Sequence, residues 1–257
     1  MAMQTTTEIE GPAVDITMLS EQEKKELIIA DTASINSSTT LGESEPSFTP
    51  AKSFHINTRG IPVLRLPLPP SELEISVHDR DGSTAYTSRR TKRSSGNCVL
   101  SDAEGKPLIS TTYYFGPSKD PLLSRLDVAE GTTHVIRTTS RWTSRNHTFL
   151  LPDGRTLTWR YKKEAGFGTK GAKGTALVLE MDKTRIAALI RNDETRTMGS
   201  KSCSAGNGGE LVLSELVNGK HGPTEELVIA TCLLMLKKEI DRRRTVQFMM
   251  ISSAVSA

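Results

Sequence analysis

The chain has 257 residues and a formal net charge of +3, with 36% hydrophobic, 25% charged and only 5% aromatic residues. This length accommodates one large or two small domains. Cys98, Cys203 and Cys232 lie far apart and form no metal-binding spacing, which excludes a disulfide-rich secreted domain and fits a reducing compartment. The first residues have neither the basic nor the apolar region of a secretory signal, so we expect a cytoplasmic protein.

Charge is distributed unevenly along the chain. Residues 1–52 contain nine acidic residues and three lysines, whereas residues 53–257 contain 21 acidic and 30 basic residues. The first segment is rich in Thr, Ser and Glu and has Phe48 as its single aromatic residue, so it cannot bury enough surface to offset the entropy of ordering. We predict a disordered acidic tail over 1–52 and a folded domain over 53–257. The basic excess of that domain indicates an anionic partner or serves solubility.

One part of this tail has a helical signature. Ser20 and Glu23 have the spacing of a capping box, and an apolar run follows at 27–29. The pattern predicts a short helix over Ser20–Ala30 that is marginally stable by itself. It is either a transient helix or a docking segment for a protein partner.

From Phe54 onward the sequence indicates a series of about ten short strands. Turn signals such as Asp79–Gly82 and Asn218–Gly219 separate them. The segment Ile61–Pro70 carries four prolines and is predicted to be an edge or an extended lead-in. Regular strand spacing favours a mainly β fold, either a closed barrel or a sandwich. The predicted strands cover residues 73–77, 83–88, 97–100, 107–115, 131–142, 147–151, 156–161, 176–181, 185–191 and 210–217.

The last predicted element is a helix over Thr224–Arg244. Thr224 is a usable N-cap, and two glutamates occupy the first turn, where the helix dipole favours negative charge. The run Leu227–Leu236 is apolar on every side of the helix apart from Thr231 and the small Cys232, so it has to be buried on every side. It is shorter than the roughly 20 residues that span a bilayer, which favours a core helix over a membrane anchor. Such a helix fits inside a closed barrel.

Several stretches resemble a known family. A β-rich domain ends in a wholly apolar helix, and hairpins of the form Phe-x-x-x-Asp-Gly and Trp-Arg precede it. Over about residues 70–245 the chain resembles the tubby C-terminal-like superfamily, which includes tubby proteins, phospholipid scramblases and plant LURP-one-related proteins. It is most similar to uncharacterised fungal members. The stretches that carry the resemblance are Ile75–Asp79, Thr158–Tyr161, Ile186–Leu189 and Leu227–Ile240.

The resemblance implies a fold and a ligand class. The fold is a closed antiparallel barrel of about twelve strands that encloses the hydrophobic C-terminal helix. Some branches of the family bind phosphoinositides or other anionic phospholipids. Scramblase-like members carry a cysteine cluster and an acidic calcium segment, and the chain has neither, so lipid scrambling is not implied. No headgroup site of tubby proteins can be matched residue by residue.

Two groups of basic residues are candidates for binding an anionic surface. The first lies in a serine-rich segment and suits lipid headgroups, nucleic acid or a nuclear import receptor, or is a solvated loop. Nucleic acid is the weakest option, because only Tyr86 is near enough in sequence to stack on bases. The second belongs to a basic stripe around Trp142 and Trp159 that includes Arg145 and suggests a lipid interface, although the burial tendency of tryptophan favours core anchors. The candidate lipid-binding residues are Arg89, Arg90, Lys92, Arg93, Arg160, Lys162 and Lys163.

No residue pattern indicates catalysis or a cofactor. The five histidines are scattered, and no HExxH, GxSxG or local Cys–His signature is present. The segment Gly166–Gly174 lacks the full Walker spacing and precedes a predicted strand, so it predicts a hairpin loop instead of a phosphate loop. We assign no catalytic residue, no metal ligand and no cofactor.

These patterns and the resemblance predict a non-enzymatic, monomeric intracellular domain that binds anionic phospholipid at membrane surfaces. The alternative is a protein-interaction or stress-response module with a protein partner and no lipid ligand. The predicted location is the cytoplasm, including the membrane periphery, with the nucleus as the alternative.

Overall fold

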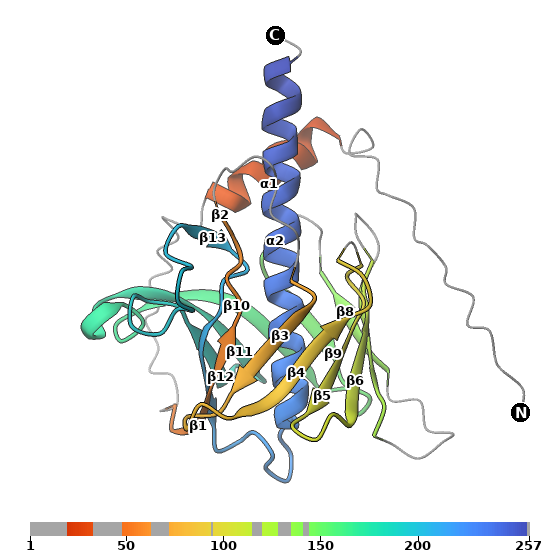
Figure 1. Cartoon of the computed structure of the whole chain (residues 1–257), viewed down its shortest axis with the longest axis vertical. Coiled ribbons are helices and arrows are strands. Elements are labelled where there is room, and N and C mark those ends of the chain that lie inside the picture. The colour runs from red at the N-terminus through yellow and green to blue at the C-terminus, as the bar shows by residue number, and fades with distance from the viewer. Residues whose placement is uncertain are drawn as a thin grey trace, which may run out of the picture.

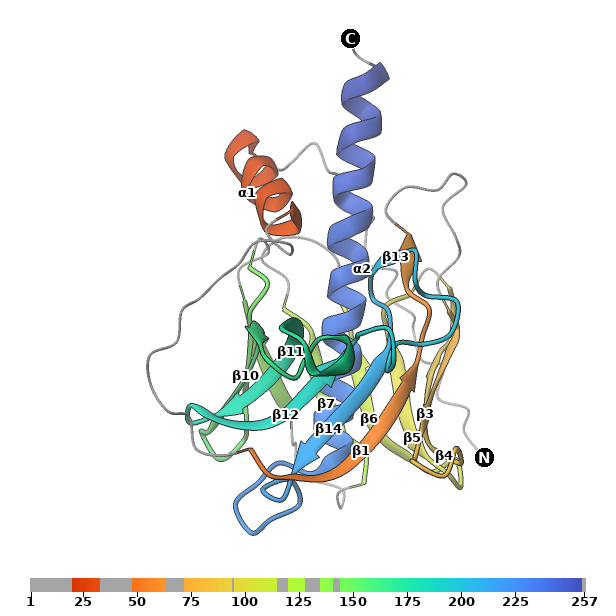
Figure 2. The same cartoon turned by 90° about the vertical axis from the view of Figure 1, so that its left-hand side faces the viewer.

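Twelve antiparallel strands close into a barrel around one long helix in the computed structural model (Figures 1 and 2). The prediction of a mainly β, closed antiparallel barrel that encloses a hydrophobic C-terminal helix is confirmed. The structure describes residues 20–32, 48–62, 72–93, 95–114, 120–127, 135–140 and 144–255.

Most barrel strands lie beside their neighbours in sequence. The order runs from β3 to β12 with each strand next to the one before it, and β1 closes the barrel between β3 and β14. Outside the barrel, β2 (Ile61–Pro62) pairs with β13 (Cys203–Ala205), and a 3-10 turn, η3 (Thr169–Gly171), lies in the β10–β11 hairpin loop. The barrel strands are β1 (Pro50–Asn57), β3 (Glu74–His78), β4 (Thr84–Arg90), β5 (Cys98–Asp102), β6 (Pro107–Thr112), β7 (Leu122–Arg125), β8 (Val135–Thr139), β9 (His147–Leu150), β10 (Thr156–Glu164), β11 (Gly174–Met181), β12 (Thr184–Ile190) and β14 (Gly209–Ser214).

Alternation along the strands fills the barrel interior. Phe54 and Ile56 of β1 and Leu157 and Trp159 of β10 are buried at every second position, as expected when successive side chains of a strand point to opposite faces. These inward side chains belong to the same core as the C-terminal helix.

The helix α2 (Glu225–Val255) passes through the barrel, and all ten residues of Leu227–Leu236 are buried. Trp159 Nε1 donates a hydrogen bond of 3.0 Å to Thr231 Oγ1 inside the barrel. The core interpretation of Trp159 is therefore confirmed, and a polar group in the apolar run has a partner. Trp142 lies outside the described residues.

The start of α2 is capped differently from the prediction. Thr224 directly precedes the helix, as predicted for an N-cap, but its Oγ1 is buried and has no hydrogen-bond partner among the described residues, so the predicted side-chain cap is wrong. Asn218 Oδ1 instead accepts a bond of 2.8 Å from the backbone N–H of Glu225. Asn218 adopts a positive φ of 62° in the turn before the helix, a conformation that asparagine tolerates, and this turn brings its carboxamide to the helix end.

The predicted end of α2 at Arg244 is also wrong, because the helix continues to Val255. Basic residues at 237–244 suggested a C-terminus, but no glycine or proline follows to stop the helix. The last turns of α2 project beyond the strands in Figures 1 and 2. We call the end of the barrel through which α2 leaves the helix-exit end.

The predicted short N-terminal helix is present as α1 (Glu21–Thr32), which packs against α2 at the helix-exit end. Its capping box forms as expected, with bonds from Glu23 N to Ser20 Oγ at 3.2 Å and from Ser20 N to Glu23 Oε2 at 2.9 Å. Strand β1 begins at Pro50, so the expected boundary between tail and domain at residue 53 falls inside a strand. The disorder predicted for the remainder of the tail and most of the proline-rich segment lie outside the described residues.

Candidate functional site

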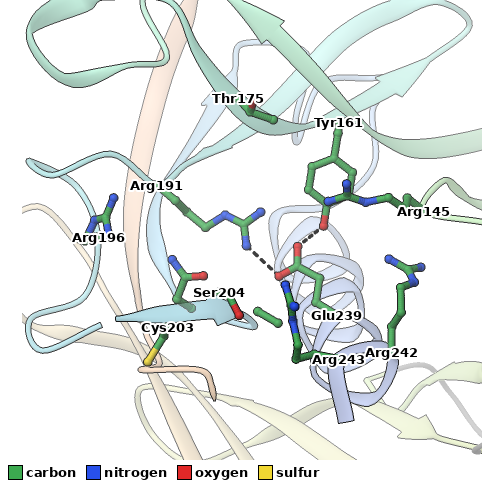
Figure 3. Close-up of a pocket in the computed structure, with 12 residues that line it drawn as sticks. Arg145, Tyr161, Thr175, Arg191, Arg196, Cys203, Ser204, Glu239, Arg242 and Arg243 are labelled. Atoms are coloured by element: carbon green, nitrogen blue, oxygen red, sulfur yellow. Dashed lines mark hydrogen bonds and ion pairs between the residues drawn. The ribbon is translucent and has the colours of Figure 1, made fainter. Parts of the chain in front are cut away.

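A pocket of about 220 Å³ opens at the helix-exit end, between α2 and the barrel wall (Figure 3). Strands β10 and β11 and the residue after β12 form one side, the segment around β13 forms another, and α2 forms a third. We call it the arginine pocket. Its lining residues are Arg145, Tyr161, Thr175, Arg191, Arg196, Cys203, Ser204, Ala205, Asn207, Glu239, Arg242 and Arg243.

Glu239 of α2 fixes the base of this pocket. Its Oε2 accepts a bond of 2.8 Å from Arg191 Nη1 and another of 2.8 Å from the backbone N–H of Gly206, and its Oε1 accepts from the hydroxyl of Tyr161. Burial alone would raise the pKa of Glu239, but the Arg191 guanidinium and these hydrogen bonds hold it below the ordinary value. The carboxylate therefore stays ionised and links α2 to β10, β12 and the β13 segment.

Gly206 allows the β13 segment to reach Glu239. Its φ is +70°, and a Cβ built there would lie 2.2 Å from Ile240 Cγ1 and 3.1 Å from the carbonyl oxygen of Leu236. Only glycine combines this left-handed conformation with so close an approach to a helix.

Arg145 stacks on the ring of Tyr161, with 3.9 Å between its guanidinium carbon and the ring centroid. Stacking of this kind holds an arginine in place while its N–H donors remain in the guanidinium plane. Arg145 Nε is buried and has no hydrogen-bond partner among the described residues. Arg145 thus lines the pocket with a guanidinium that the Tyr161 ring holds in place.

The charge of the pocket is strongly positive, since five arginines and one glutamate line it. Two of the arginines are also bound at the rim: Arg196 pairs with Asp193 at 3.2 Å, and Arg242 donates to the carbonyl oxygen of Ser144 at 2.6 Å. Arginine forks bind phosphate and carboxylate oxygens in pairs. The volume is below the roughly 300–1,000 Å³ of pockets for drug-sized ligands, so it suits a compact anion.

A second charged cluster lies on another side of α2 and is internally satisfied. Asp241 accepts from the hydroxyl of Tyr113 at 2.5 Å and pairs with Lys237 at 2.5 Å. Burial and the nearby Asp241 carboxylate raise the pKa of Tyr113. Because these groups hold one another, this side of the exit anchors α2 to the end of β6 and offers no comparable site.

His147 of β9 is buried on a third side of α2. Neither ring nitrogen has a hydrogen-bond partner among the described residues. Burial, and then the positive charges of Lys238 and Arg242, hold the pKa of His147 well below 6.5. Burial likewise lowers the pKa of Lys238 to about 8. The cavity beside these residues measures about 10 Å³, room for a single water at most.

The first predicted basic group lies at the end of β4 and in the loop after it. Arg89 is exposed and pairs with Glu74 at 2.7 Å, whereas Arg90 is buried on the inward face. Lys92 and Arg93 are exposed. The group is thus divided between the barrel interior, a cross-strand ion pair and the solvent.

The second predicted group lies on β10, six strands away from β4 in the closed barrel of twelve. Arg160 and Lys162 both pair with Glu180 of the neighbouring β11, at 3.0 and 2.7 Å, while Lys163 is exposed. β4 and β10 run in the same direction, so both groups approach the helix-exit end, but on opposite sides of it. The structure does not bring them together into one site.

None of the seven predicted residues lines the arginine pocket. Arg145 belonged to the wider basic stripe, while Arg191 and Arg196 follow a buried strand and carry no motif. Glu239 and Arg243 are four residues apart on α2 and therefore share a face. That spacing, directly after an apolar run, is the one signal in the sequence that points to the pocket.

The described residues contain no group of three or more His, Cys, Asp or Glu side chains placed to hold a metal ion. In the same part of the chain, no helix has both the length and the apolar character needed to cross a bilayer. The chain matches no protein-family model, no curated protein and no solved structure. Fold and site together define a helix-filled β-barrel with an arginine-lined pocket at one end.

Proposed function

We propose that the domain binds the phosphate-bearing headgroup of an anionic phospholipid in the arginine pocket. The observation that carries the proposal is the arrangement of five arginines around one carboxylate in an open pocket of about 220 Å³. Glu239 accepts hydrogen bonds from Arg191 and Tyr161, and Arg145 stacks on the Tyr161 ring. The guanidinium groups of Arg191 and Arg145 are therefore positioned before a ligand arrives. Preorganisation of this kind lowers the entropic cost of binding.

The position of the pocket supports a membrane as the source of the headgroup. Lys92, Arg93 and Lys163 are exposed near the same end of the barrel, outside the pocket. Each basic residue near an anionic bilayer contributes about 1 kcal/mol of attraction. The basic residues predicted from the sequence would then add long-range attraction around a specific pocket. The proposed setting is the cytoplasmic membrane periphery, and membership of the tubby C-terminal-like superfamily remains a prediction.

Vesicle sedimentation tests the proposal. The protein should bind vesicles of phosphatidylcholine with phosphatidylserine or phosphatidic acid and not vesicles of phosphatidylcholine alone, and the binding should weaken as salt rises. Soluble glycerol 3-phosphate, titrated by calorimetry, should bind the pocket weakly and compete with the vesicles. Tight binding of the soluble compound without vesicle binding would assign the pocket to a soluble phosphate instead. Binding to neither probe would reject the proposed function.

A protein-interaction module remains the second candidate, because Ile29 on α1 is 63% exposed beside α2. This candidate predicts that α1 is needed for capture of a protein and that the arginine pocket is dispensable. Arginine-to-glutamine changes in the pocket separate the two candidates, since only the first depends on them.

A further inference from the structure

Exposed apolar side chains are concentrated at the helix-exit end. Nine large apolar side chains are exposed in the described part of the chain, and six of them lie on elements at this end. The other three, Leu126, Leu150 and Leu216, lie at the opposite end of the barrel. The six are Ile29, Leu73, Tyr114, Met198, Phe248 and Met250.

Phe248 is the one aromatic residue of α2, and it lies on the part of the helix beyond the barrel. Its side chain is 53% exposed, and Met250 two residues later is 51% exposed. At about 1.5 Å per residue, Phe248 lies about 10 Å beyond Asp241 along the helix axis. The helix is continuous from the barrel core through this point, so the projecting part of α2 that carries Phe248 and Met250, which we call the tip, has a rigid support (Figure 2).

Basic residues surround the base of this tip. Arg242 and Arg243 line the arginine pocket, and Arg244 follows on the next position of α2. A short apolar projection above a cationic base is complementary to an anionic bilayer, which is negative at its surface and apolar about 5–10 Å below it. A protein partner with an apolar cavity would not require the cationic surroundings.

We infer that the helix-exit end is the membrane-facing surface, and that Phe248, on the part of α2 that projects beyond the barrel, inserts into the bilayer while a headgroup occupies the arginine pocket. The inference rests on the proposed function and extends it by fixing the orientation of the barrel. The barrel axis stands on the membrane with α2 leading. The opposite end, which carries Leu216 in the loop before α2, faces away from the membrane.

An environment-sensitive label at position 248 tests the orientation. The label is placed on Phe248→Cys in a protein with Cys98→Ser and Cys203→Ser, and Cys232 remains because it is buried. The matched control carries the label on Leu216→Cys, which is also exposed in the native protein. On vesicles of phosphatidylcholine with phosphatidylserine, emission from position 248 should shift to the blue and be quenched by spin-labelled acyl chains. Emission from position 216 should not change.

A binding measurement complements the label. Phe248→Ser should weaken vesicle binding about tenfold, the equivalent of burying one phenylalanine, and Phe248→Trp should restore it. Glycerol 3-phosphate should bind both variants as it binds the wild type, because position 248 lies outside the pocket.

Each outcome decides between named alternatives. A protein that sediments with vesicles while the label at 248 stays in a water-like environment overturns the orientation and leaves headgroup binding intact. A label at 248 that is shielded without vesicles, in a protein that elutes as a dimer, assigns the tip to a second copy and also overturns the inference. Failure to bind both vesicles and glycerol 3-phosphate rejects the proposed function first, and the orientation with it.

Discussion

The Arg191 guanidinium and the Glu239 carboxylate form a nearly buried ion pair, with 2.8 Å between Nη1 and Oε2. The pair joins the end of β12 to α2 at the point where the helix leaves the apolar interior. Tyr161 and the backbone of Gly206 complete the coordination of the carboxylate. One side chain thus both attaches the helix to the barrel wall and shapes the arginine pocket.

Removal of Glu239 should therefore destabilise the fold as well as the pocket. Glu239→Ala leaves the Arg191 charge without its partner, and loss of one member of a buried ion pair costs about 3–5 kcal/mol. Glu239→Gln keeps the volume and one of the two acceptor oxygens, so its effect should be smaller. Urea unfolding measures both variants. An alanine variant as stable as the wild type would show that the pair does not hold α2 in place.

The pH dependence of stability should show the contribution of His147. Its folded-state pKa lies well below 6.5, so the unfolded chain binds a proton that the folded chain does not as the pH falls below 6.5. The unfolded state is then favoured, and stability falls with decreasing pH in this window. The His147→Gln variant should therefore lose less stability than the wild type between about pH 7 and about pH 5. The control is His221→Gln, at an exposed position, which should behave as the wild type.

Gly206→Ala should destabilise the segment that closes the pocket. The added Cβ would lie 2.2 Å from Ile240 Cγ1, at a φ of +70°. Gly105→Ala is a matched control, because its φ is +84° but no atom lies within 4 Å of the added Cβ. The control should lose only about 1 kcal/mol of unfolding free energy, from backbone strain. Gly206→Ala should lose clearly more unfolding free energy in the same denaturation measurement. Equal losses would mean that the contact with α2 relaxes freely.

Leu233→Asp tests whether the barrel depends on the helix inside it. Leu233 is 6% exposed within the core, so the new carboxylate would be buried without a partner. The variant should lose its cooperative unfolding transition or fail to express in soluble form. Leu216→Asp introduces the same charge at a side chain that is 46% exposed and should leave the transition intact. A cooperatively folded Leu233→Asp protein would contradict the central role of α2.

The fold was accessible from the sequence because local patterns and packing agree. The run Leu227–Leu236 is apolar on every side, so it must be buried on every side. Short strands with regular turn signals predict a closed barrel that can surround it. The position at which α2 ends could not be predicted in the same way. The basic residues at 237–244 resemble a helix C-terminus, but they find partners within a longer helix and at the barrel exit, such as Asp241 for Lys237 and the carbonyl oxygen of Ser144 for Arg242.

The pocket could not be predicted because its residues come together only through barrel closure. Arg145 precedes β9, Arg191 follows β12 and Arg243 lies on α2, so no local spacing relates them. The local density of basic residues instead favoured Arg89 and Arg160 as ligand-binding residues. Their acidic partners, Glu74 and Glu180, lie on neighbouring strands. A count of basic residues along the sequence does not reveal which of them are neutralised by cross-strand partners.

The central claim is that the arginine pocket binds the headgroup, and charge-matched variants measured by vesicle sedimentation test it most directly. Arg145→Gln with Arg243→Gln removes two charges from the pocket, and Arg155→Gln with Lys183→Gln removes two charges from the opposite end of the barrel. At about 1 kcal/mol per basic residue, the pocket pair should weaken binding to anionic vesicles about tenfold to thirtyfold. The distal pair should bind as the wild type does. Equal losses in the two double variants, or no loss in the pocket pair, would contradict headgroup binding in the arginine pocket.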